Sequence, residues 1–597
     1  MKRVLLLLFI FIGSAMALQA QTPLLTRGPY LQKLTSRSVV VKWQTLLPGS
    51  AEVKFGLNAN ALDQSVTDET SSATHVLTLS NLQPATRYYY AIFVNGAMLQ
   101  GDDQNYFLTA PVAGTAGDYS FWVIGDCGNN STNQKQVLDS YLAYRGERPT
   151  NAWITLGDNA YLGGLDLEFK VGFFDIYQGS VTRNSPLFPA PGNHDYNNLP
   201  INQWFKQVPY YEIFDLPSQG ESGGEPSNTE AFYAFDYGNV HFLSLDSYGE
   251  EELQFRLFDT LGPQAQWIKR DLEKNQLPWV VAYWHHPPFS MASHNSDTEG
   301  ELVDMREQFL PFLERLGVDL VFCGHSHGYE RSRPMKGHYG MESTFDPAIH
   351  NVDQSSGRYD GSENSCTYVK QRGNAEDGTI YIVAGSSGQL GGSQLTYPHD
   401  AMYFSDVDNG GSFVIDVKDN RLDGSFLCAD GVIRDQFTIV KDANRRQQIL
   451  ALPGELVTLT ASWPGDYLWS TGDTTRSIVV RAEDTKTYSV SDRFQCLEDR
   501  YEVKASGVGI NKNTASRGLK LAPNPAIGEV ALEYNGQVAI NGWRITDITG
   551  RLVKHDFFQP SLIYKERISL NKLHSGIYLI TLTGASGAVE TQKLEIQ

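Results

Sequence analysis

Five short apolar segments between residues 121 and 327 each end in polar residues, and this repeated pattern constrains the fold more than any other feature. The segments read FWVIGD, AWITLGD, LFPAPGNHD, WVVAYWHH and VDLVFCGHSH. Helix-like stretches such as NQKQVLDSYLAY and GPQAQWIKRDLEKN lie between them, the second with Ala265, Ile268 and Leu272 at helical spacing. Strands that alternate with helices predict an α/β domain with a largely buried sheet.

The polar residues that end these segments carry carboxylate, amide or imidazole groups. They are Asp126, Asp158, Asn193, His285, His325 and His327. Because open α/β sheets bind ligands beyond the C-terminal ends of their strands, we expect these side chains to gather along one edge of a sheet. Oxygen and imidazole ligands suit iron, zinc and manganese. One Gly-Asp pair alone would be an ordinary turn, but five such motifs in one order predict a metal site.

The motif order GDxG, GDxxY, GNH(D/E), HxP and GHxH resembles the calcineurin-like metallophosphoesterase superfamily. GDNAY, which contains Tyr161, and GHSHGYER resemble the purple acid phosphatases in particular, and HHPPFSMASH (residues 285–294) resembles their mammalian-type members. The resemblance covers about residues 118–440. It implies a catalytic domain built as a layered β-sandwich flanked by helices, with a two-metal site that hydrolyses phosphate esters.

The family's ligand pattern implies two ions that share the carboxylate of Asp158. The first ion, ferric iron in the family, would be bound by Asp126, Asp158, Tyr161 and His327. The second ion, which is iron, zinc or manganese, would be bound by Asp158, Asn193, His285 and His325. Tyr161 could instead be a packing residue. Two such ions would clamp the attacking and leaving oxygens of a phosphoryl group and supply a metal-bound hydroxide for in-line attack.

Two further histidines are candidates for contact with the substrate. The resemblance assigns substrate contact to His194, which follows Asn193, and phosphate binding or proton donation to His294. His294 could also be an exposed loop residue. We interpret His286 as a bystander.

Four other residues near the motifs are interpreted as structural. Cys127 and Cys323 are expected to be packing residues, and Glu330 and Arg331 are predicted to form a structural ion pair. The chain contains five cysteines and no CxxC pair, so a thiolate zinc site is not expected. The odd count leaves at least one thiol unpaired, and the sequence does not reveal which cysteines pair.

The regions on either side of the α/β domain predict all-β accessory domains. Residues 23–112 contain alternating strands such as 38–45 and 51–56, and resemble the fibronectin type III-like domain that precedes the catalytic domain of plant-type purple acid phosphatases. Residues 446–506 predict a small immunoglobulin-like sandwich. A linker rich in Gly, Asn, Ser and Lys follows at 507–518, and residues 515–597 predict one more β-domain.

Both ends of the chain carry features of exported proteins. Residues 1–20 read as a signal peptide, because a basic start precedes a nine-residue apolar run that is too short to span a bilayer. An uncleaved anchor is the alternative. PNPA, DITGRLV, LHSGIYLITL and Lys593 resemble the type IX secretion sorting tail of Bacteroidetes, whereas the alternative is an ordinary accessory domain. We therefore expect passage through the periplasm, secretion or surface attachment by the secretion machinery, and no transmembrane segment in the mature protein.

The sequence thus predicts a secreted two-metal phosphatase that acts on phosphomonoesters. Its formal net charge of -20 argues against binding to nucleic acids. A phosphodiesterase, nucleotidase or pyrophosphatase with the same metal core is one alternative, with residues 334–378 as a candidate substrate mouth. A surface adhesion protein with a non-catalytic phosphoesterase scaffold is the other.

Overall fold

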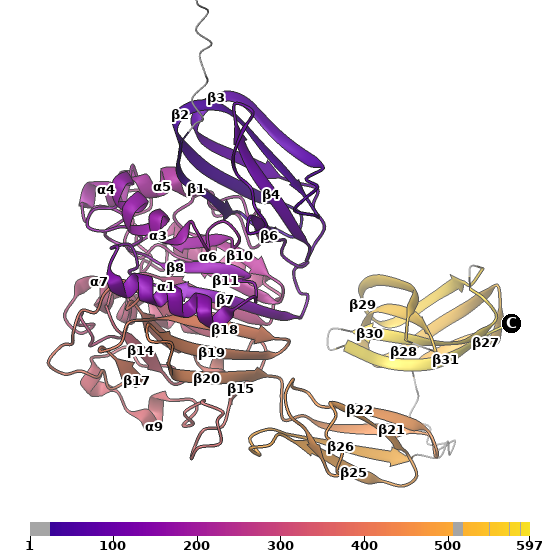
Figure 1. Cartoon of the computed structure of the whole chain (residues 1–597). Helices are drawn as coiled ribbons and strands as arrows, with labels where there is room; N and C mark the ends of the chain where they lie inside the picture. Colours follow the sequence, from indigo (N-terminus) through magenta and orange to yellow (C-terminus); the bar gives the residue numbers. More distant parts are fainter. Residues whose placement is uncertain (1–23, 506–517, 549, 572, 585–586) are drawn as a thin grey trace, which may run out of the picture. The chain divides into compact units, whose positions relative to one another are not determined.

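The computed structural model describes residues 24–505, 518–548, 550–571, 573–584 and 587–597. The chain divides into two compact units, Met1–Ala505 and Ser506–Gln597, each of which is described by itself (Figure 1). The predicted signal peptide and residues 507–517 of the predicted linker lie outside the described residues. Within the described ranges, no helix is both long and apolar enough to cross a membrane.

The N-terminal strands form one six-stranded antiparallel sheet with the shape of a half-barrel. Its strands are β1 (Leu25–Gln32), β2 (Val39–Gly56), β3 (Gln64–Leu79), β4 (Arg87–Val94), β5 (Ala97–Gln100) and β6 (Tyr106–Leu108). The segments 38–45 and 51–56, predicted as separate strands, belong to the long β2. The first part of β2 pairs with β1 and the last part with β4, so one strand connects both sides of the half-barrel. The all-β prediction for this region is confirmed.

The half-barrel packs against the α/β region through buried and partly buried polar contacts. Tyr30 Oη donates to the carbonyl of Ile213 at 2.7 Å, and Lys42 Nζ donates to the carbonyl of Glu212 at 2.9 Å. Arg27 forms an ion pair with Asp166 at 2.6 Å. These contacts anchor helical segments that follow the motifs of Tyr161 and Asn193 in the chain.

The α/β region is built on two mixed seven-stranded sheets. The first has the order β15 (Tyr368–Lys370), β20 (Ile433–Lys441), β19 (Arg421–Cys428), β18 (Gly411–Lys418), β7 (Asp118–Ile124), β8 (Ala152–Leu156) and β9 (Leu187–Ala190). The second has the order β10 (Tyr233–Tyr237), β11 (Val240–Ser244), β12 (Trp279–Trp284), β13 (Leu320–Cys323), β16 (Ile380–Ala384), β14 (Tyr329–Ser332) and β17 (Met402–Asp406).

The two sheets pack face to face through aromatic side chains. The ring centroids of Phe121 and Phe242 lie 4.9 Å apart, and those of Phe322 and Phe413 lie 5.1 Å apart. The central strands are buried on both faces, because helices cover the outer side of each sheet. This explains why these strands read as continuous apolar runs rather than alternating patterns.

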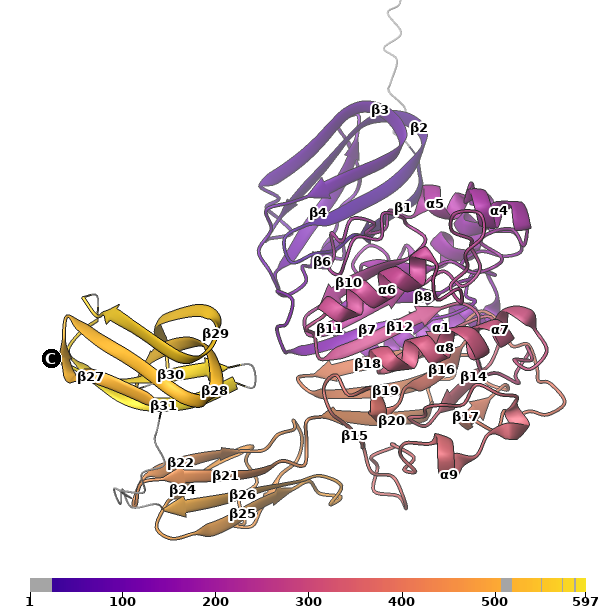
Figure 2. The same ribbon diagram turned by 180° about the vertical axis from the view of Figure 1, so that it is seen from behind.

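Helices cover the outer faces of both sheets, as Figures 1 and 2 show. Helix α1 (Thr132–Arg145) is capped by Ser131 and stacks Tyr141 on Trp122 of β7 with ring centroids 4.2 Å apart. Helix α6 (Pro263–Lys274) buries Trp267 and Ile268 against the second sheet. The helices predicted at 133–144 and 262–275 are therefore confirmed, and the layered α/β prediction with them.

Shorter helical segments fill the connections between the strands. They are α2 (Asp166–Glu168), the π-helix η1 (Phe169–Phe174), α3 (Asp175–Tyr177), α4 (Pro200–Phe205), α5 (Pro209–Ile213), α7 (Gly300–Asp304), the π-helix η2 (Met305–Phe309), α8 (Leu310–Leu313), and the 3-10 turns η3 (Glu314–Leu316), η4 (Glu342–Thr344) and η5 (Ala375–Asp377), with α9 (Pro347–His350).

Residues 446–505 form two small sheets around a core that contains Trp463 and Trp469. Their strands are β21 (Arg446–Ala451), β22 (Leu456–Thr460), β23 (Leu468–Trp469), β24 (Ser477–Arg481), β25 (Lys486–Ser491) and β26 (Glu498–Ala505), with the orders β21-β26-β25-β23 and β22-β24.

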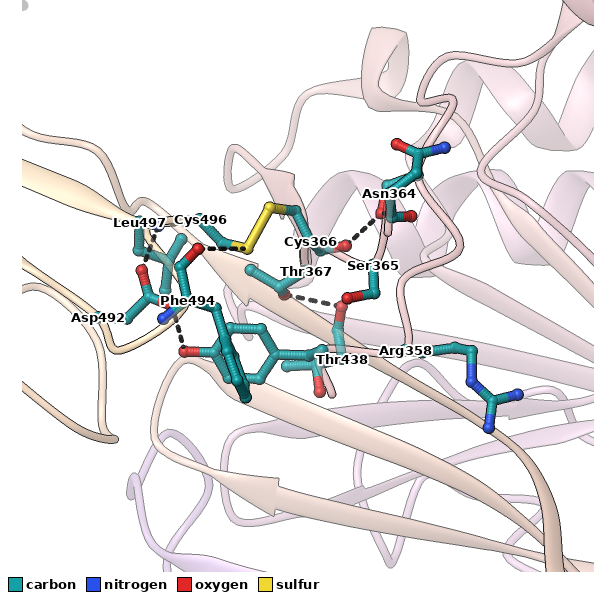
Figure 3. Close-up of a disulfide and its surroundings, with 12 residues drawn as sticks. Arg358, Asn364, Ser365, Cys366, Thr367, Thr438, Asp492, Phe494, Cys496 and Leu497 are labelled. Atoms are coloured by element: carbon teal, nitrogen blue, oxygen red, sulfur yellow. Dashed lines mark hydrogen bonds between the residues drawn. A yellow bond between two sulfur atoms is a disulfide. The ribbon is translucent and has the colours of Figure 1, made fainter. Parts of the chain in front are cut away.

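A disulfide between Cys366 and Cys496 fastens this small sandwich to the α/β region (Figure 3). Beside it, Tyr359 Oη donates to Asp492 at 3.0 Å. Cys127, Cys323 and Cys428 are buried free thiols. The first two are packing residues, as the sequence indicated.

The second unit is a five-stranded sheet. Its order is β27 (Leu519–Ile527), β31 (Gly587–Ile596), β30 (Gly576–Gly584), β28 (Glu529–Asp547) and β29 (Leu552–Ser569). Trp543, Ile545 and Ile580 belong to its own hydrophobic core. The all-β prediction for the end of the chain is confirmed.

Candidate metal centre

The predicted ligands follow parallel strands at the ends where those strands meet. Asp126, Asp158 and Asn193 follow β7, β8 and β9, which run parallel in the first sheet. His285 and His325 follow β12 and β13, which run parallel in the second sheet. Because the C-terminal ends of parallel strands lie along one edge of a sheet, the polar residues that follow these strands lie together at that edge.

The residues predicted to bind the second ion converge around Asp158. His285 Nε2 lies 3.3 Å from Asp158 Oδ2 and 2.9 Å from Asn193 Oδ1. His325 Nδ1 lies 3.3 Å from His285 Nε2. Ligand atoms of Asp126, Asp158 and His285 all lie within 4.8 Å of one another, so Asp158 is next to both predicted sets.

The residues predicted to bind the first ion also lie together. Tyr161 Oη donates to Asp126 Oδ1 at 3.1 Å and lies 3.2 Å from His327 Nε2. His327 Nε2 is 3.6 Å from Asp126 Oδ1. The structure therefore brings all the predicted ligands into one cluster at the joint edge of the two sheets.

The backbone at this edge adopts conformations that are uncommon for side-chain-bearing residues. Asp126, Asp158 and His325 have φ values of 55°, 50° and 65°. Such left-handed residues are held against a steric cost and concentrate at functional sites. Gly192 is required here, because a Cβ atom would lie 2.3 Å from the amide nitrogen and Oδ1 of Asp158.

Hydrogen bonds behind the cluster orient its donor atoms. His285 Nδ1 bonds to the carbonyl of Leu156 at 2.8 Å, which leaves Nε2 facing Asp158 and Asn193. Asn193 Nδ2 donates to Asn198 Oδ1 at 2.6 Å, so that its own Oδ1 points inward. Such outer contacts fix the orientation of metal ligands and raise their affinity.

The buried carboxylate of Asp195 ties the ligand loops together. It accepts hydrogen bonds from the amide nitrogens of Gly192 at 2.8 Å and Asn159 at 3.1 Å. Burial, together with the charge of Asp158, raises the pKa of Asp195 to about 7. This carboxyl group holds the loop after β9 against the loop after β8.

The electrostatics of the cluster fit positively charged ions. Burial opposes ionisation of Asp158, but the imidazoles of His285 and His194 outweigh it and hold the pKa of Asp158 below its usual range. Burial would lower the pKa of His285, but Asp158 and Asp126 raise it to about 9. Among the described residues, neither carboxylate has a Lys or Arg within 4.0 Å. Two buried carboxylates with imidazole and amide donors suit iron, zinc or manganese.

Burial and the nearby carboxylates of Asp126 and Asp158 raise the pKa of Tyr161 well above 10. Without an ion, the phenol therefore keeps its proton and donates a hydrogen bond to Asp126. A bound cation would be the partner that favours the phenolate.

Both predicted substrate-contacting histidines lie next to the cluster. His194 Nε2 is 3.8 Å from Asp158 Oδ2, and its ring lies 4.6 Å from the ring of Tyr161. The ring of His294 lies 3.8 Å from that of His325, and its side chain is about one-third exposed. Each histidine combines a position beside the predicted ligands with access to solvent.

His286, interpreted as a bystander, also lies within reach of the cluster. Its ring centroid is 4.5 Å from that of His325, and Nδ1 is 2.9 Å from Ser247 Oγ. Burial, followed by the neighbouring histidines, lowers the pKa of His286 well below 6.5. His286 is therefore neutral and close enough to hold the ring of His325 in place.

Three residues around the cluster were not identified from the sequence. Glu299 contacts His294 and His325, Gln389 Nε2 is 3.4 Å from His327 Nδ1, and Ser293 Oγ accepts from the amide of His327 at 2.8 Å. All three lie in polar loops, where nothing in the local sequence separates Glu299 and Gln389 from ordinary surface residues. Only the position of Ser293 inside the HHPPFSMASH segment was a signal.

The predicted ion pair between Glu330 and Arg331 is wrong. These residues are neighbours on β14, so their side chains point to opposite faces of the sheet. Arg331 instead pairs with Asp435 at 2.5 Å, and Glu330 accepts a hydrogen bond from the amide of Met291 at 3.1 Å.

Three regions of the chain match models of known protein families. Residues 119–329 match the calcineurin-like phosphoesterases, residues 29–110 match the purple acid phosphatase N-terminal domain, and residues 520–597 match the secretion system C-terminal sorting domain.

Several plant phosphatases are similar in sequence to this chain. A phosphoenolpyruvate phosphatase from Allium cepa is 26% identical over 52% of this chain and 62% of its own length. A purple acid phosphatase from Glycine max is 26% identical over 50% of this chain and 63% of its own length. Purple acid phosphatase 23 from Arabidopsis thaliana is 29% identical over 44% of this chain and 58% of its own length. The chain thus spans about three fifths of the length of these relatives.

A solved structure shares the fold. The purple acid phosphatase PPD1 from yellow lupin (Lupinus luteus) superposes with a TM-score of 0.51 and 17% sequence identity. The superposition covers 70% of this chain and 74% of the lupin chain.

Proposed function

Because the chain is a purple acid phosphatase-like calcineurin-like phosphoesterase with a C-terminal secretion sorting domain, we propose that it is an exported two-metal hydrolase of phosphomonoesters. The proposal rests on one observation: side chains with potential metal-ligating atoms, from five strand ends, converge around the carboxylate of Asp158. A domain that served only as a scaffold would not need buried carboxylates on residues whose backbone is held in the left-handed conformation.

The donor set divides into two sites that share Asp158. Asp126, Tyr161 and His327 would complete the first, for which ferric iron is proposed. Asn193, His285 and His325 would complete the second, for iron, zinc or manganese. When bound, such a pair of ions neutralises the phosphate and activates the attacking water. The ions would also supply the positive field that a chain with a net charge of -20 otherwise lacks.

His194 and His294 are proposed to act on the substrate directly. Nδ1 of His194 is 2.6 Å from the carbonyl of Leu162, and Nε2 faces Asp158 at 3.8 Å. Nδ1 of His294 is 2.7 Å from Glu299, and Nε2 has no hydrogen-bond partner among the described residues. A histidine so placed can donate a proton to the leaving oxygen as the ester bond breaks.

The sorting domain implies secretion or attachment to the cell surface. We propose that export has two stages, with residues 1–20 directing passage to the periplasm and the C-terminal domain engaging the secretion machinery. The substrate would then be a phosphate ester outside the cytoplasm.

The test is hydrolysis of 4-nitrophenyl phosphate by the full-length protein, measured together with its metal content. Asp158→Ala should lose metal and more than about 1000-fold in kcat/KM, equivalent to more than ~4 kcal/mol of transition-state stabilisation. Asp175→Ala, a surface carboxylate paired with Lys170, is the control and should change neither.

Full activity in Asp158→Ala, or a wild-type protein that is metal-free and inactive, would refute the proposal. A panel of a monoester, a diester, a nucleotide and pyrophosphate would separate a phosphatase from the alternative hydrolases with the same metal core.

A further inference from the structure

The carboxylate of Glu299 lies between two histidines of the centre, and we infer that it is a positioning residue that holds both in their working orientation. The inference rests on the proposed function, because it concerns one proposed ligand, His325, and one proposed proton donor, His294. None of the family's strand-end motifs contains Glu299.

The side chain of Glu299 is fixed within its own loop. Oε1 accepts a hydrogen bond from the amide of Asn295 at 2.8 Å, and the amide of Glu299 donates to the carbonyl of Asn295 at 3.1 Å. Glu299 also directly precedes helix α7, which begins at Gly300. The carboxylate therefore has a defined position before it meets either histidine.

The other oxygen of this carboxylate faces both imidazole rings. Oε2 lies 2.7 Å from His294 Nδ1 and 3.6 Å from His325 Nε2. The remaining nitrogen of His325, Nδ1, faces His285 Nε2 at 3.3 Å. The two nitrogens of His325 thus have different partners, since Nδ1 faces the proposed ligands and Nε2 faces the carboxylate.

A carboxylate behind a metal-binding imidazole fixes the ring and makes it a better ligand. Here the same oxygen also holds His294, whose ring lies 3.8 Å from that of His325. Rotation of one ring would displace the other. Glu299 therefore couples the geometry of the second ion site to the geometry of the proton donor.

The same three side chains could instead hold a cation of their own, since their ligand atoms lie within 4.8 Å of one another. That arrangement would share His325 between two ions and would remove Nδ1 of His294 from its hydrogen bond. The positioning role requires neither, and a count of ions per chain separates the two possibilities.

The test compares Glu299→Gln with Glu299→Asp, which keeps the charge, and with Glu301→Gln as the matched control two residues along the chain. The affinity of the metal-depleted full-length protein for zinc at its weaker site is measured by chelator competition. We expect a loss of about 10–100-fold in Glu299→Gln, a smaller loss in Glu299→Asp, and no change in Glu301→Gln.

The second readout is the dependence of kcat on the leaving group. Loss of a positioned proton donor should slow an alkyl phosphate by at least about tenfold more than 4-nitrophenyl phosphate, whose leaving group needs no proton. An equal loss of kcat on both substrates, with unchanged zinc affinity, would overturn the inference. A third ion per chain in the wild type that is absent from Glu299→Gln would also overturn it. An active wild-type enzyme unaffected by Glu299→Gln would refute only this inference, whereas an inactive metal-loaded wild type would refute the proposed function.

Discussion

Two buried clusters of aspartate and histidine lie at opposite ends of neighbouring strands in the α/β region. One contains Asp126, Asp158 and His285 at the C-terminal strand ends. In the other, His241, near the start of β11, pairs with Asp236 of β10 and Asp271 of α6. Strands β11 and β12 are parallel, with His241 beside Val280, so the second cluster lies at the N-terminal ends of the strands.

The His241 cluster is internally complete. Nδ1 bonds to Asp236 at 2.7 Å and Nε2 to Asp271 at 2.6 Å. Burial would lower the pKa of His241, but the two carboxylates outweigh burial and raise it to about 9. The imidazolium therefore stays charged between its partners, and both of its nitrogens are used.

The cluster around Asp158 has the same residue types, but we call it open because several potential ligand atoms face one place without each having a single ion-pair partner. Its donor atoms face one another instead of pairing fully, and Tyr161, Asn193 and His327 add further donors. Perturbed pKa values occur in both clusters, so they do not by themselves identify a functional site. The number of ligand atoms that converge on one place, rather than a shifted pKa, therefore separates the candidate metal centre from the structural ion pair.

The largest effect should come from removing a carboxylate of the open cluster. Asp126→Asn should lose about one ion per chain and more than about 1000-fold in kcat/KM, while the metal-free protein keeps its stability because a buried negative charge is removed. Metal analysis, phosphate release and thermal melts check this. A variant that keeps both ions and its activity would break the distinction between the clusters.

The corresponding change in the closed cluster, that of His241, should lower stability and leave metal content and activity unchanged. Asp271→Asn should destabilise the protein by about 3–5 kcal/mol, because it leaves a buried ion pair without one partner. Its metal content and its kcat at 25 °C should stay close to wild type. Denaturant unfolding of the full-length protein measures the loss, and a drop in metal content would show that the two ends of the strands are not independent.

The closed cluster should also make stability depend on pH. The folded-state pKa of His241 is about 9, above its usual value of 6.5, so its contribution is complete below pH 6.5 and is lost as pH rises through 9. The contribution is on the order of 3 kcal/mol. The stability difference between wild type and His241→Gln, measured without metal, should shrink by this amount between pH 6.5 and 10. A difference that stays constant would contradict the charged pairing.

The smallest effect should come from an outer contact of the open cluster. Asn198→Gly removes the group that orients Asn193, and glycine accepts the left-handed φ of 50° at this position. The affinity for the second ion should fall by about 10–100-fold, with little change in stability. Metal titration checks this, and unchanged affinity would show that Asn193 is oriented by other contacts.

The candidate ligands, and the sheet edge at which they lie, could be predicted from the sequence. Apolar runs that end in Gly-Asp, Gly-Asn-His or Gly-His-x-His are local signals, because the strand and the turn that follows it are encoded by adjacent residues. Helices α1 and α6 could be predicted for the same reason. Their apolar spacing lies within the helices themselves, and their N-cap residues, Ser131 and Gly262, directly precede them.

Contacts between distant segments could not be predicted from the sequence. Glu299 reaches His325, Arg331 pairs with Asp435 rather than Glu330, and Cys366 joins Cys496 across a separation of 130 residues. No local pattern encodes such partners, since each depends on how sheets and loops pack after they form. The closed His241 cluster belongs here too, because its three members come from β10, β11 and α6 and meet only in the packed fold.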